Sequence, residues 1–144
     1  MFNRLFGIKI NLRWASKPSR KSLPSRYFDS EEYICMTTIK FKKINPNAQI
    51  PVYGSAEAAG FDFKSVEFVV INPGETKLVK TGLQVQFPEG YELQVRPRSG
   101  LALKNSITVL NSPGTVDSDY RGELGVIIIN HGKTPFTIGV VGGG

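Results

Sequence analysis

Short apolar runs separated by turn sequences restrict this chain to an all-β fold. Proline lies beside or near glycine in Asn72-Pro73-Gly74-Glu75, Pro88-Glu89-Gly90 and Ser112-Pro113-Gly114. Such turns combine a φ fixed by proline with a positive φ at glycine. Short strands spaced about ten residues apart with turns of this kind are typical of a sandwich or barrel. The pattern predicts strands at Ile39–Phe41, Phe68–Ile71, Leu78–Thr81, Leu83–Phe87, Leu93–Arg96, Ile107–Leu110, Leu124–Asn130 and Phe136–Val140.

Helical periodicity is almost absent, and only a short turn is expected at Gly100–Asn105. The continuous apolar run Val126–Ile129 predicts a strand that is buried on both faces. The 144 residues suffice for one hydrophobic core. No run approaches the ~20 apolar residues that cross a membrane, so no membrane partner is expected. The single cysteine, Cys35, excludes an internal disulfide and suits a reducing compartment.

Most of the net charge of +6 belongs to the first quarter of the chain. Residues 1–35 contain seven Lys or Arg and three Asp or Glu, whereas residues 36–144 contain 11 and nine. We therefore expect an unstructured basic leader, 1–35, ahead of a folded domain, 36–144. The folded part shows no aromatic platforms among clustered basic residues, so nucleic acid is not an expected partner of the domain.

Three interpretations of the leader stay open. It is poor in acids and contains Arg and Ser, which is typical of an organelle transit peptide. Its apolar residues from Ile8 to Trp14 alternate with a period of two, however, and not with that of an amphipathic helix. The alternatives are an inert extension upstream of a second start at Met36 and a nucleic-acid-binding arm. A start at Met36 predicts a nuclear or cytoplasmic protein, and a transit peptide predicts a mitochondrial one.

Three segments carry more functional groups than a core requires. In Ala58-Ala59-Gly60-Phe61-Asp62-Phe63 a carboxylate lies between two aromatics, which alone indicates a strand with one outward-facing Asp. In Arg96-Pro97-Arg98-Ser99-Gly100-Leu101-Ala102 a strand end is followed by groups that suit phosphate oxygens: a guanidinium, a hydroxyl and a glycine N–H. A surface turn with a spare Arg is the alternative interpretation of this second segment.

The third segment, 111–124, is flanked by strong β runs and should form a wide hairpin or a loop at a barrel mouth. It reads Asn111-Ser112-Pro113-Gly114-Thr115-Val116-Asp117-Ser118-Asp119-Tyr120-Arg121-Gly122-Glu123-Leu124. An amide, two acids and a phenol lie within it, and dense functional groups on a loop of a rigid sheet indicate a site. The open backbone of a hairpin can present N–H and C=O groups to a flat base edge, and Asn111 offers both a donor and an acceptor.

In this order and spacing, the three segments resemble motifs one to three of the trimeric deoxyuridine triphosphatases (dUTPases). Pro46-Asn47-Ala48-Gln49-Ile50-Pro51 and Asn130-His131-Gly132 also resemble that family, and the likeness covers about residues 37–141. It implies a distorted jelly-roll-like β-barrel. The implied reaction is hydrolysis of dUTP to dUMP and pyrophosphate with Mg²⁺, which keeps uracil out of DNA and supplies dUMP for dTMP synthesis.

The resemblance also implies roles for individual residues. Asp117 would orient and activate the attacking water and hold the 3′-hydroxyl. Tyr120 would lie against the deoxyribose and leave no room for a 2′-hydroxyl. The uracil edge would be read inside the hairpin by the side chain of Asn111 and by backbone groups of Gly114, Thr115, Val116 and Gly125.

The phosphates would be bound by Arg98, Ser99 and Gly100, which in this family come from a neighbouring subunit. The resemblance therefore implies a homotrimer with shared sites. Asp62 would hold Mg²⁺ through water, because Mg²⁺ keeps part of its hydration shell. Three other residues receive simpler interpretations: Asp119 as a turn-capping acid, Arg121 as a salt-bridge residue and His131 as a loop residue.

The chain departs from the family pattern at Gly139-Val140-Val141-Gly142-Gly143-Gly144, where the family continues into motifs four and five. We therefore expect a C-terminally truncated form that lacks the last strand of the barrel. By itself it should show strongly reduced or no dUTP hydrolysis, and near-normal pyrophosphate release by residues 36–144 would contradict this. The alternative function is a non-catalytic chain that binds nucleotide or associates with the full-length enzyme. A dCTP deaminase of the same fold is disfavoured, because the Asp117-to-Tyr120 arrangement resembles the hydrolase.

Overall fold

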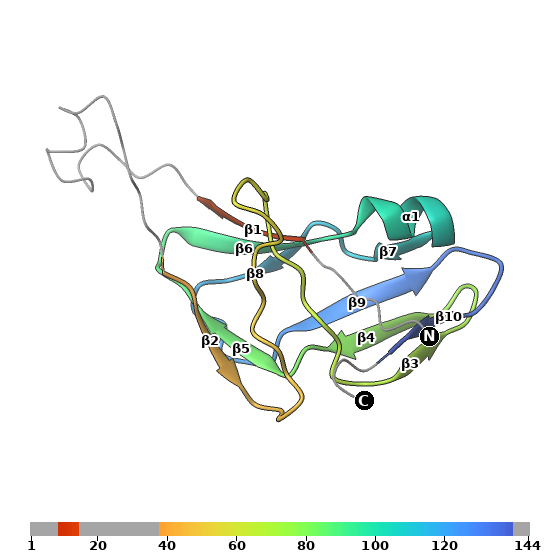
Figure 1. Cartoon of the computed structure of the whole chain (residues 1–144), viewed down its shortest axis with the longest axis horizontal. Helices are drawn as coiled ribbons and strands as arrows, with labels where there is room; N and C mark the ends of the chain where they lie inside the picture. The colour runs from red at the N-terminus through yellow and green to blue at the C-terminus, as the bar shows by residue number, and fades with distance from the viewer. Residues whose placement is uncertain (1–8, 15–37, 140–144) are drawn as a thin grey trace, which may run out of the picture.

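The structure, a computed structural model, describes residues 9–14 and 38–139, and their regular elements are strands with one short helix (Figure 1). Four small antiparallel sheets have the strand orders β1-β6-β8, β4-β9-β7, β2-β5 and β3-β10. Their elements are β1 (Lys9–Trp14), β2 (Lys40–Lys43), β3 (Val69–Ile71), β4 (Thr76–Lys80), β5 (Leu83–Gln86), β6 (Tyr91–Arg96), α1 (Ser99–Asn105), β7 (Ile107–Val109), β8 (Gly114–Val116), β9 (Gly125–Asn130) and β10 (Phe136–Ile138). The all-β prediction is confirmed, although the described strands do not join into one closed barrel.

The hydrophobic core lies between these sheets. Phe63, Leu83, Leu93 and Ile128 are each at most 2% exposed. Three aromatic rings on the side of β2, those of Phe41, Phe61 and Phe63, meet edge to face with centroids 5.9 to 6.0 Å apart. This is the geometry that aromatic pairs prefer. Because Phe61 and Phe63 both point into the core, the residue between them must point away from it.

The strand β9 differs from its prediction. Val126 and Ile128 are buried, whereas Ile127 between them is 37% exposed. The expectation that Val126–Ile129 is buried on both faces is therefore wrong for this chain. β9 is the central strand of an antiparallel sheet, and only one face of that sheet packs on the core, so successive side chains alternate between core and surface.

Part of the leader is a strand. Residues Lys9–Trp14 form β1, which pairs antiparallel with β6 from Lys9↔Arg96 to Trp14↔Tyr91. The prediction of an unstructured leader is wrong for this segment, and the alternation with a period of two was the signal of a strand. The rest of the leader and residues 140–144 lie outside the described residues. The described part of the chain holds no helix with the length and apolarity of a membrane span.

One buried amide fixes the end of β9 and the start of β10. Asn130 is completely buried, and its Nδ2 donates to the carbonyls of Ile71 and Thr134 at 2.8 and 2.9 Å. Its Oδ1 accepts the N–H of Gly132 at 2.8 Å. A buried amide with its donors and acceptor paired is stabilising, whereas an unpaired one would be costly. His131 lies in this loop, as expected, and its side chain is exposed.

The turn between β3 and β4 holds a titratable group with a clear pKa shift. The carboxylate of Glu75 accepts the backbone N–H of Asn72 at 2.8 Å. This hydrogen bond, with a smaller contribution from Lys77, lowers the pKa of Glu75 below its usual value. The carboxyl is partly exposed and lies in a turn, so the shift reflects local turn chemistry and does not mark a catalytic group.

Candidate functional site

The third segment forms the loop of a wide hairpin, as predicted. β7 and β9 pair antiparallel with Val109 opposite Ile128. The backbone N–H of Leu110 then donates to the carbonyl of Ile127 at 2.9 Å. Beyond this bond the two arms separate, and β8 within the loop pairs with β6 instead. Residues 111–116 on one arm are therefore not paired with the start of β9 at Gly125 on the other, and we call this unpaired part of the hairpin the hairpin opening.

Asn111 lies at this opening, folded over Gly114. A Cβ added to Gly114 would lie 3.3 Å from Asn111 Nδ2 and 3.3 Å from Val95 Cβ, so the glycine makes the space for the amide. Gly114 is buried, whereas Asn111 and Thr115 are exposed and Val116 is half-buried. The structure thus places an amide, which offers both a donor and an acceptor, beside the strand Gly114–Val116.

The loop continues through a compact turn that carries Asp117 and Tyr120. The N–H of Tyr120 donates to the carbonyl of Asp117 at 3.1 Å, and both side chains are exposed. The Tyr120 hydroxyl donates to the carbonyl of Glu123 at 3.0 Å. The ring lies against Gly122, where an added Cβ would be 2.5 Å from Tyr120 Oη. The phenol is therefore held by a hydrogen bond while Tyr120 remains 44% exposed.

Arg121 has a different role from the one predicted. Its Nη1 donates to the backbone carbonyls of Ser118 and Tyr120 at 2.9 and 3.0 Å. In the described part of the chain the guanidinium forms no salt bridge, so the structure gives that interpretation no support. A guanidinium offers five donors in a planar fork, and here it closes the turn that presents Asp117 and Tyr120.

Three side chains that the sequence did not single out hold the closing end of this loop. The hydroxyl of Thr81 donates to the carbonyl of Leu124 at 2.7 Å. The carboxylate of Glu123 accepts the N–H of Gly82 at 3.0 Å, and Gln84 Nε2 donates to the carbonyl of Arg121 at 2.8 Å. Glu123 belongs to the third segment, whereas Thr81 and Gln84 precede their partners in the loop by 43 and 37 residues. Only the folded structure shows their connection to the loop.

The second segment leads from β6 into α1. The helix begins at Ser99, one residue before the predicted turn, and Arg98 is its N-cap with extended φ and ψ. Ser99 and Gly100 are exposed, and the first turn contains no acidic side chain that would repel an anion. Arg98 is half-buried. This arrangement keeps a hydroxyl and a glycine at the surface next to a guanidinium, which is compatible with phosphate oxygens.

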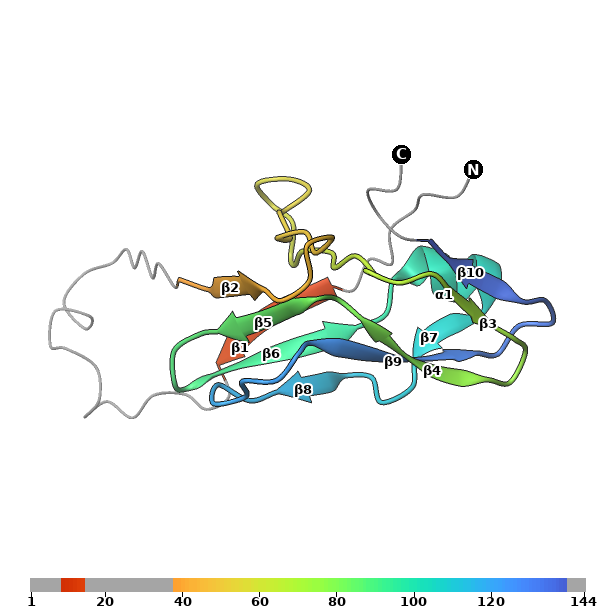
Figure 2. The same ribbon diagram turned by 90° about the horizontal axis from the view of Figure 1, so that it is seen from below.

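The second and third segments meet along β6 and β8, but Asp117 lies at the opposite end of this strand pair from Arg98 and Ser99. β8 pairs antiparallel with β6, with Val95 opposite Gly114 and Leu93 opposite Val116. Arg98 and Ser99 follow the end of β6 near Gly114, whereas Asp117 follows the other end of β8 (Figure 2). The separation is about six residues of extended chain, on the order of 20 Å. One chain therefore does not bring Asp117 and Ser99 into a single small site.

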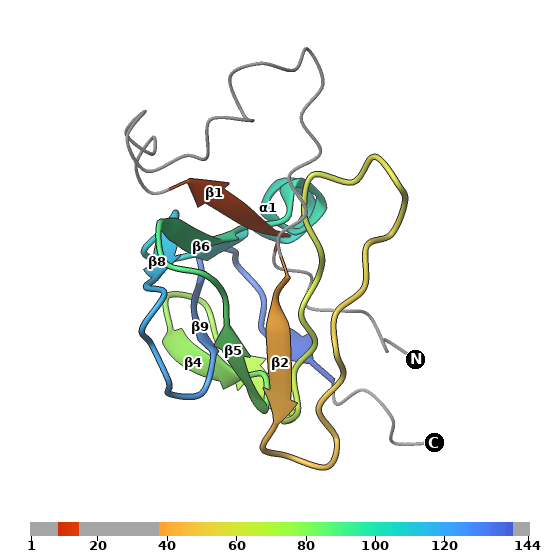
Figure 3. The ribbon, with the colours of Figure 1, turned by 90° about the vertical axis from the view of Figure 1, so that its left-hand side faces the viewer.

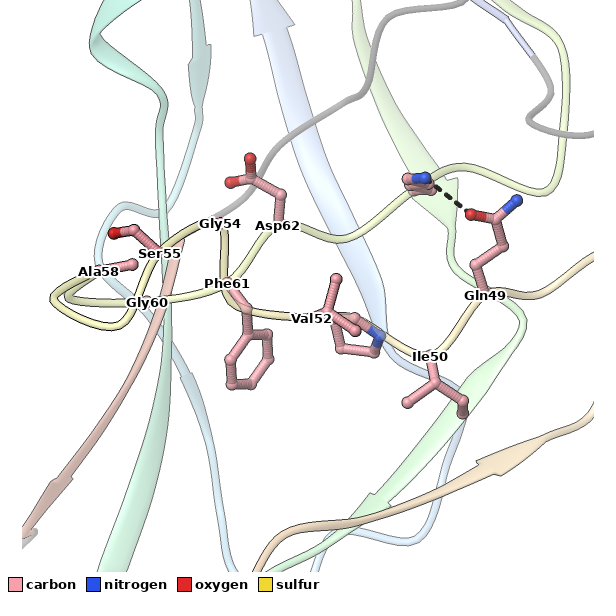
Figure 4. A pocket seen from close by; sticks show the side chains of 11 residues that line it. Gln49, Ile50, Val52, Gly54, Ser55, Ala58, Gly60, Phe61 and Asp62 are labelled. Atoms are coloured by element: carbon pink, nitrogen blue, oxygen red, sulfur yellow. Dashed lines mark hydrogen bonds between the residues drawn. The ribbon is translucent and has the colours of Figure 1, made fainter.

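Asp62 of the first segment borders a separate cleft of about 490 Å³. The residues that line the cleft belong to the loop between β2 and β3. Figure 3 shows this loop on the side of the molecule away from β8. Asp62 is half-buried and points away from Phe61 (Figure 4). On the far wall Lys64 Nζ donates to Gln49 Oε1 at 2.7 Å. Asp62 belongs to no cluster of three or more His, Cys, Asp or Glu in the described residues.

The similarity to known proteins covers most of the chain. A family model described as dUTPase matches residues 46–141. A deoxyuridine 5′-triphosphate nucleotidohydrolase from Nautilia profundicola is 59% identical over 100 residues, 69% of this chain and 70% of the relative. One from Clostridioides difficile is 57% identical over 103 residues, 72% of each chain.

Solved structures of phage enzymes are also similar. A mutant dUTPase from phage phi11 of S. aureus, described with a structural Mg(II) ion, has a TM-score of 0.62 at 34% identity. The match covers 66% of this chain and 61% of the phage chain. A mutant dUTPase of Staphylococcus bacteriophage 80alpha with dUpNHpp has a TM-score of 0.61 at 34% identity, and the match covers 67% and 61% of the two chains. This chain thus spans less than two thirds of the phage enzymes that it resembles.

Proposed function

This chain belongs to the dUTPase family, and from that membership we propose that it hydrolyses dUTP to dUMP and pyrophosphate. The observation that carries the proposal is the hairpin opening, where the amide of Asn111 lies over Gly114 and the ring of Tyr120 is fixed against Gly122. A single-ring base would lie between the two arms of backbone, and the sugar that follows the base would meet the phenol of Tyr120.

Uracil recognition would come from the opening itself. Asn111 supplies one donor and one acceptor, and the backbone of Gly114, Thr115, Val116 and Gly125 would supply further N–H and C=O groups. Uracil presents a C=O, an N–H and a second C=O along one edge, so amide groups complement it as a neighbouring strand would. The close contact of Asn111 and Val95 around Gly114 leaves little space, and this confinement would disfavour the methyl group of thymine.

Deoxyribose selection would come from Tyr120. Its hydroxyl is held by the carbonyl of Glu123, so the ring cannot easily turn aside. A ring fixed against C2′ of the sugar would clash with the 2′-hydroxyl of a ribonucleotide. The exposed carboxylate of Asp117 lies three residues away in the same turn, where it would hold the 3′-hydroxyl and the attacking water.

In the hydrolytic step the water oxygen would form a bond to the α-phosphorus, and the bond from that phosphorus to the oxygen bridging to the β-phosphate would break. Asp117 would accept the proton of the water, and pyrophosphate would leave with the bridging oxygen. Arg98, Ser99 and Gly100 would bind the phosphate oxygens. Positioning and charge neutralisation would supply most of the rate enhancement.

Asp62 fits the magnesium site that the family implies. A lone carboxylate at the rim of a cleft is a hard oxygen ligand, and it suits an ion that retains waters and is otherwise held by substrate phosphates. When bound, Mg²⁺ would neutralise phosphate charge. The chain's own contribution would be to orient one carboxylate outward by burying Phe61 and Phe63 on either side of it.

The site would be shared between copies of the chain. The separation of Asp117 from Ser99 along β6 and β8 supports this, since a second copy would have to supply Arg98 and Ser99. An apolar surface also remains on the outer face of β4, β9 and β7. Leu78 is paired with Ile127, Leu110 bonds the Ile127 carbonyl, and the side chains of Leu78, Ile127 and Leu110 are 57, 37 and 52% exposed. Such a patch suits an interface, and we propose a homotrimer.

The proposal is tested by product analysis of the full chain with Mg²⁺. Incubation with excess protein should convert dUTP into equal amounts of dUMP and pyrophosphate, with dTTP and UTP converted at least about a hundredfold more slowly. Excess protein makes even a low rate measurable. Binding of dUpNHpp without any product from dUTP would contradict the hydrolase and support the non-catalytic alternative. Equal rates on dUTP, dTTP and UTP would contradict the base and sugar assignments.

A further inference from the structure

We infer that Thr81, which lies outside all three motif segments, is a positioning residue for Tyr120 and so for selection between deoxyribose and ribose. The inference rests on the proposed function of the hairpin site and names a determinant of its specificity. Thr81 lies between β4 and β5 and is 2% exposed. It does not contact the hairpin opening directly, so any effect must pass through the residues that it bonds.

Thr81 makes two hydrogen bonds to one carbonyl. Its N–H and its hydroxyl both donate to the oxygen of Leu124, at 3.2 and 2.7 Å. The hydroxyl oxygen also accepts the N–H of Leu83 at 3.3 Å, and the N–H of Leu124 donates to the carbonyl of Leu83 at 2.8 Å. Leu124 is thereby bonded on both its N–H and its C=O, and it is buried with an exposed fraction of 4%.

The carbonyl held by Thr81 and the one that holds Tyr120 are consecutive. The Tyr120 hydroxyl donates to the oxygen of Glu123, and Thr81 fixes the oxygen of Leu124. The orientation of one peptide plane depends on that of the next, because only φ and ψ of the residue between them can change. Fixing the Leu124 carbonyl therefore restricts the direction of the Glu123 carbonyl, and with it the position of the phenol.

The turn that carries Thr81 is itself held firmly. Gly82 has φ +68°, and an added Cβ there would lie 2.7 Å from Asn45 Cβ and 3.0 Å from Ala48 Cβ. Its N–H donates to the Glu123 carboxylate at 3.0 Å, and its carbonyl accepts the N–H of Ile44 at 2.9 Å. The turn is thus packed against the loop after β2 on one side and bonded to residues 123 and 124 on the other. The turn at Thr81 and Gly82 therefore forms a rigid support for residues 123 and 124.

The test compares the affinities of the full chain for two imido nucleotides that resist hydrolysis, dUpNHpp and its ribose counterpart UpNHpp. In Thr81→Val, which removes the hydroxyl at nearly constant volume, we expect the preference for dUpNHpp to fall about tenfold, since a lost buried hydrogen bond is worth about that factor. Thr81→Ser keeps the hydroxyl and should restore the preference to within about twofold. Thr137→Val, at an exposed position of β10, is the matched control and should leave the preference unchanged.

A second variant gives an independent result. Tyr120→Phe removes the bond to the Glu123 carbonyl from an exposed position, so it should fold like the wild type and also lose preference for dUpNHpp. In the double variant with Thr81→Val, the preference for dUpNHpp should fall little further than in the more affected single variant. Both substitutions act on the same link between the phenol and the Glu123 carbonyl. If Thr81→Val or Tyr120→Phe prefers dUpNHpp over UpNHpp as strongly as the wild type does, the inference is overturned. Equal wild-type affinities for the two analogues would instead contradict the proposed function.

Discussion

Replacing Asp117 with Asn should lower the rate of pyrophosphate release from dUTP at least about a hundredfold, because general-base assistance contributes about 10² to 10⁴ to a rate. Asparagine keeps the size of the side chain and its capacity to accept a hydrogen bond, but it does not take a proton from water. Binding of dUpNHpp should therefore change by less than about threefold. The measurement is single-turnover release with protein in excess, combined with calorimetric titration of dUpNHpp.

Asp119 provides the matched control for this variant. It is an exposed carboxylate two residues away in the same loop. If Asp117 acts through its position and not through the general negative charge of the loop, Asp119→Asn should retain at least about half of the wild-type rate. Equal losses in the two variants would show that the loop charge matters and would remove Asp117 from its assigned role.

The Asp117→Asn chain also tests whether the site is shared. If Asp117 of one copy acts with Ser99 of another, a mixture of Asp117→Asn and Ser99→Ala chains contains some sites in which both residues are wild type. Mixing the two variant proteins, each with a lowered rate by itself, should then restore part of the wild-type rate when conditions allow subunit exchange. Mass spectrometry of the mixture would show that subunits have exchanged. If the rate of the exchanged mixture does not exceed the sum of the rates of its two components, both residues act within one chain.

The largest effect on stability is expected for Gly82→Ala. An alanine at φ +68° costs about 1 kcal/mol of backbone strain, and its Cβ would meet three side-chain atoms at 2.7, 2.9 and 3.0 Å. Two of these are Cβ atoms, of Asn45 and Ala48, which cannot move without the backbone. We expect a loss of about 3 kcal/mol in the free energy of unfolding, measured by urea titration at a fixed protein concentration.

Gly74 separates the two causes of this loss. It also has a positive φ, +79°, but nothing lies within 4 Å of an added Cβ. Gly74→Ala should therefore cost only the backbone strain of about 1 kcal/mol. If the two alanine variants lose the same stability, the packing of Gly82 against Asn45 and Ala48 contributes nothing, and the turn after β4 is not the rigid support described above.

Much of the fold could be predicted because the sequence signals it locally. The turns at Pro73-Gly74, Glu89-Gly90 and Pro113-Gly114 separate apolar runs, and the observed strands coincide with most of those runs. β8 was missed because its three residues, Gly114–Val116, pair with β6 across a long stretch of sequence and show no apolar alternation. β1 was missed as a strand because the basic, acid-poor composition of the leader indicated an unstructured segment, although its apolar residues alternate with a period of two.

The candidate site was predictable only as a set of residues. The motifs place Asn111, Asp117 and Tyr120 in one loop, and the structure keeps them there. Sequence could not show that Ser99 and Asp117 lie at opposite ends of a strand pair, since that follows from the antiparallel register. It also could not show that the Thr81 hydroxyl donates to the carbonyl of Leu124, 43 residues later in the chain. Contacts of this range depend on how the sheets pack.

The placement of dUTP in the hairpin opening is tested most directly by hydrogen–deuterium exchange of the full chain, followed by mass spectrometry of its peptides. With Mg²⁺ and dUpNHpp, exchange should slow in peptides that cover residues 111–125, where the backbone of Gly114, Thr115, Val116 and Gly125 would bond uracil. The corresponding thymidine analogue should leave these peptides unchanged. Unaltered exchange over 111–125 with dUpNHpp, or slowing confined to the cleft at residues 49–64, would contradict the assignment.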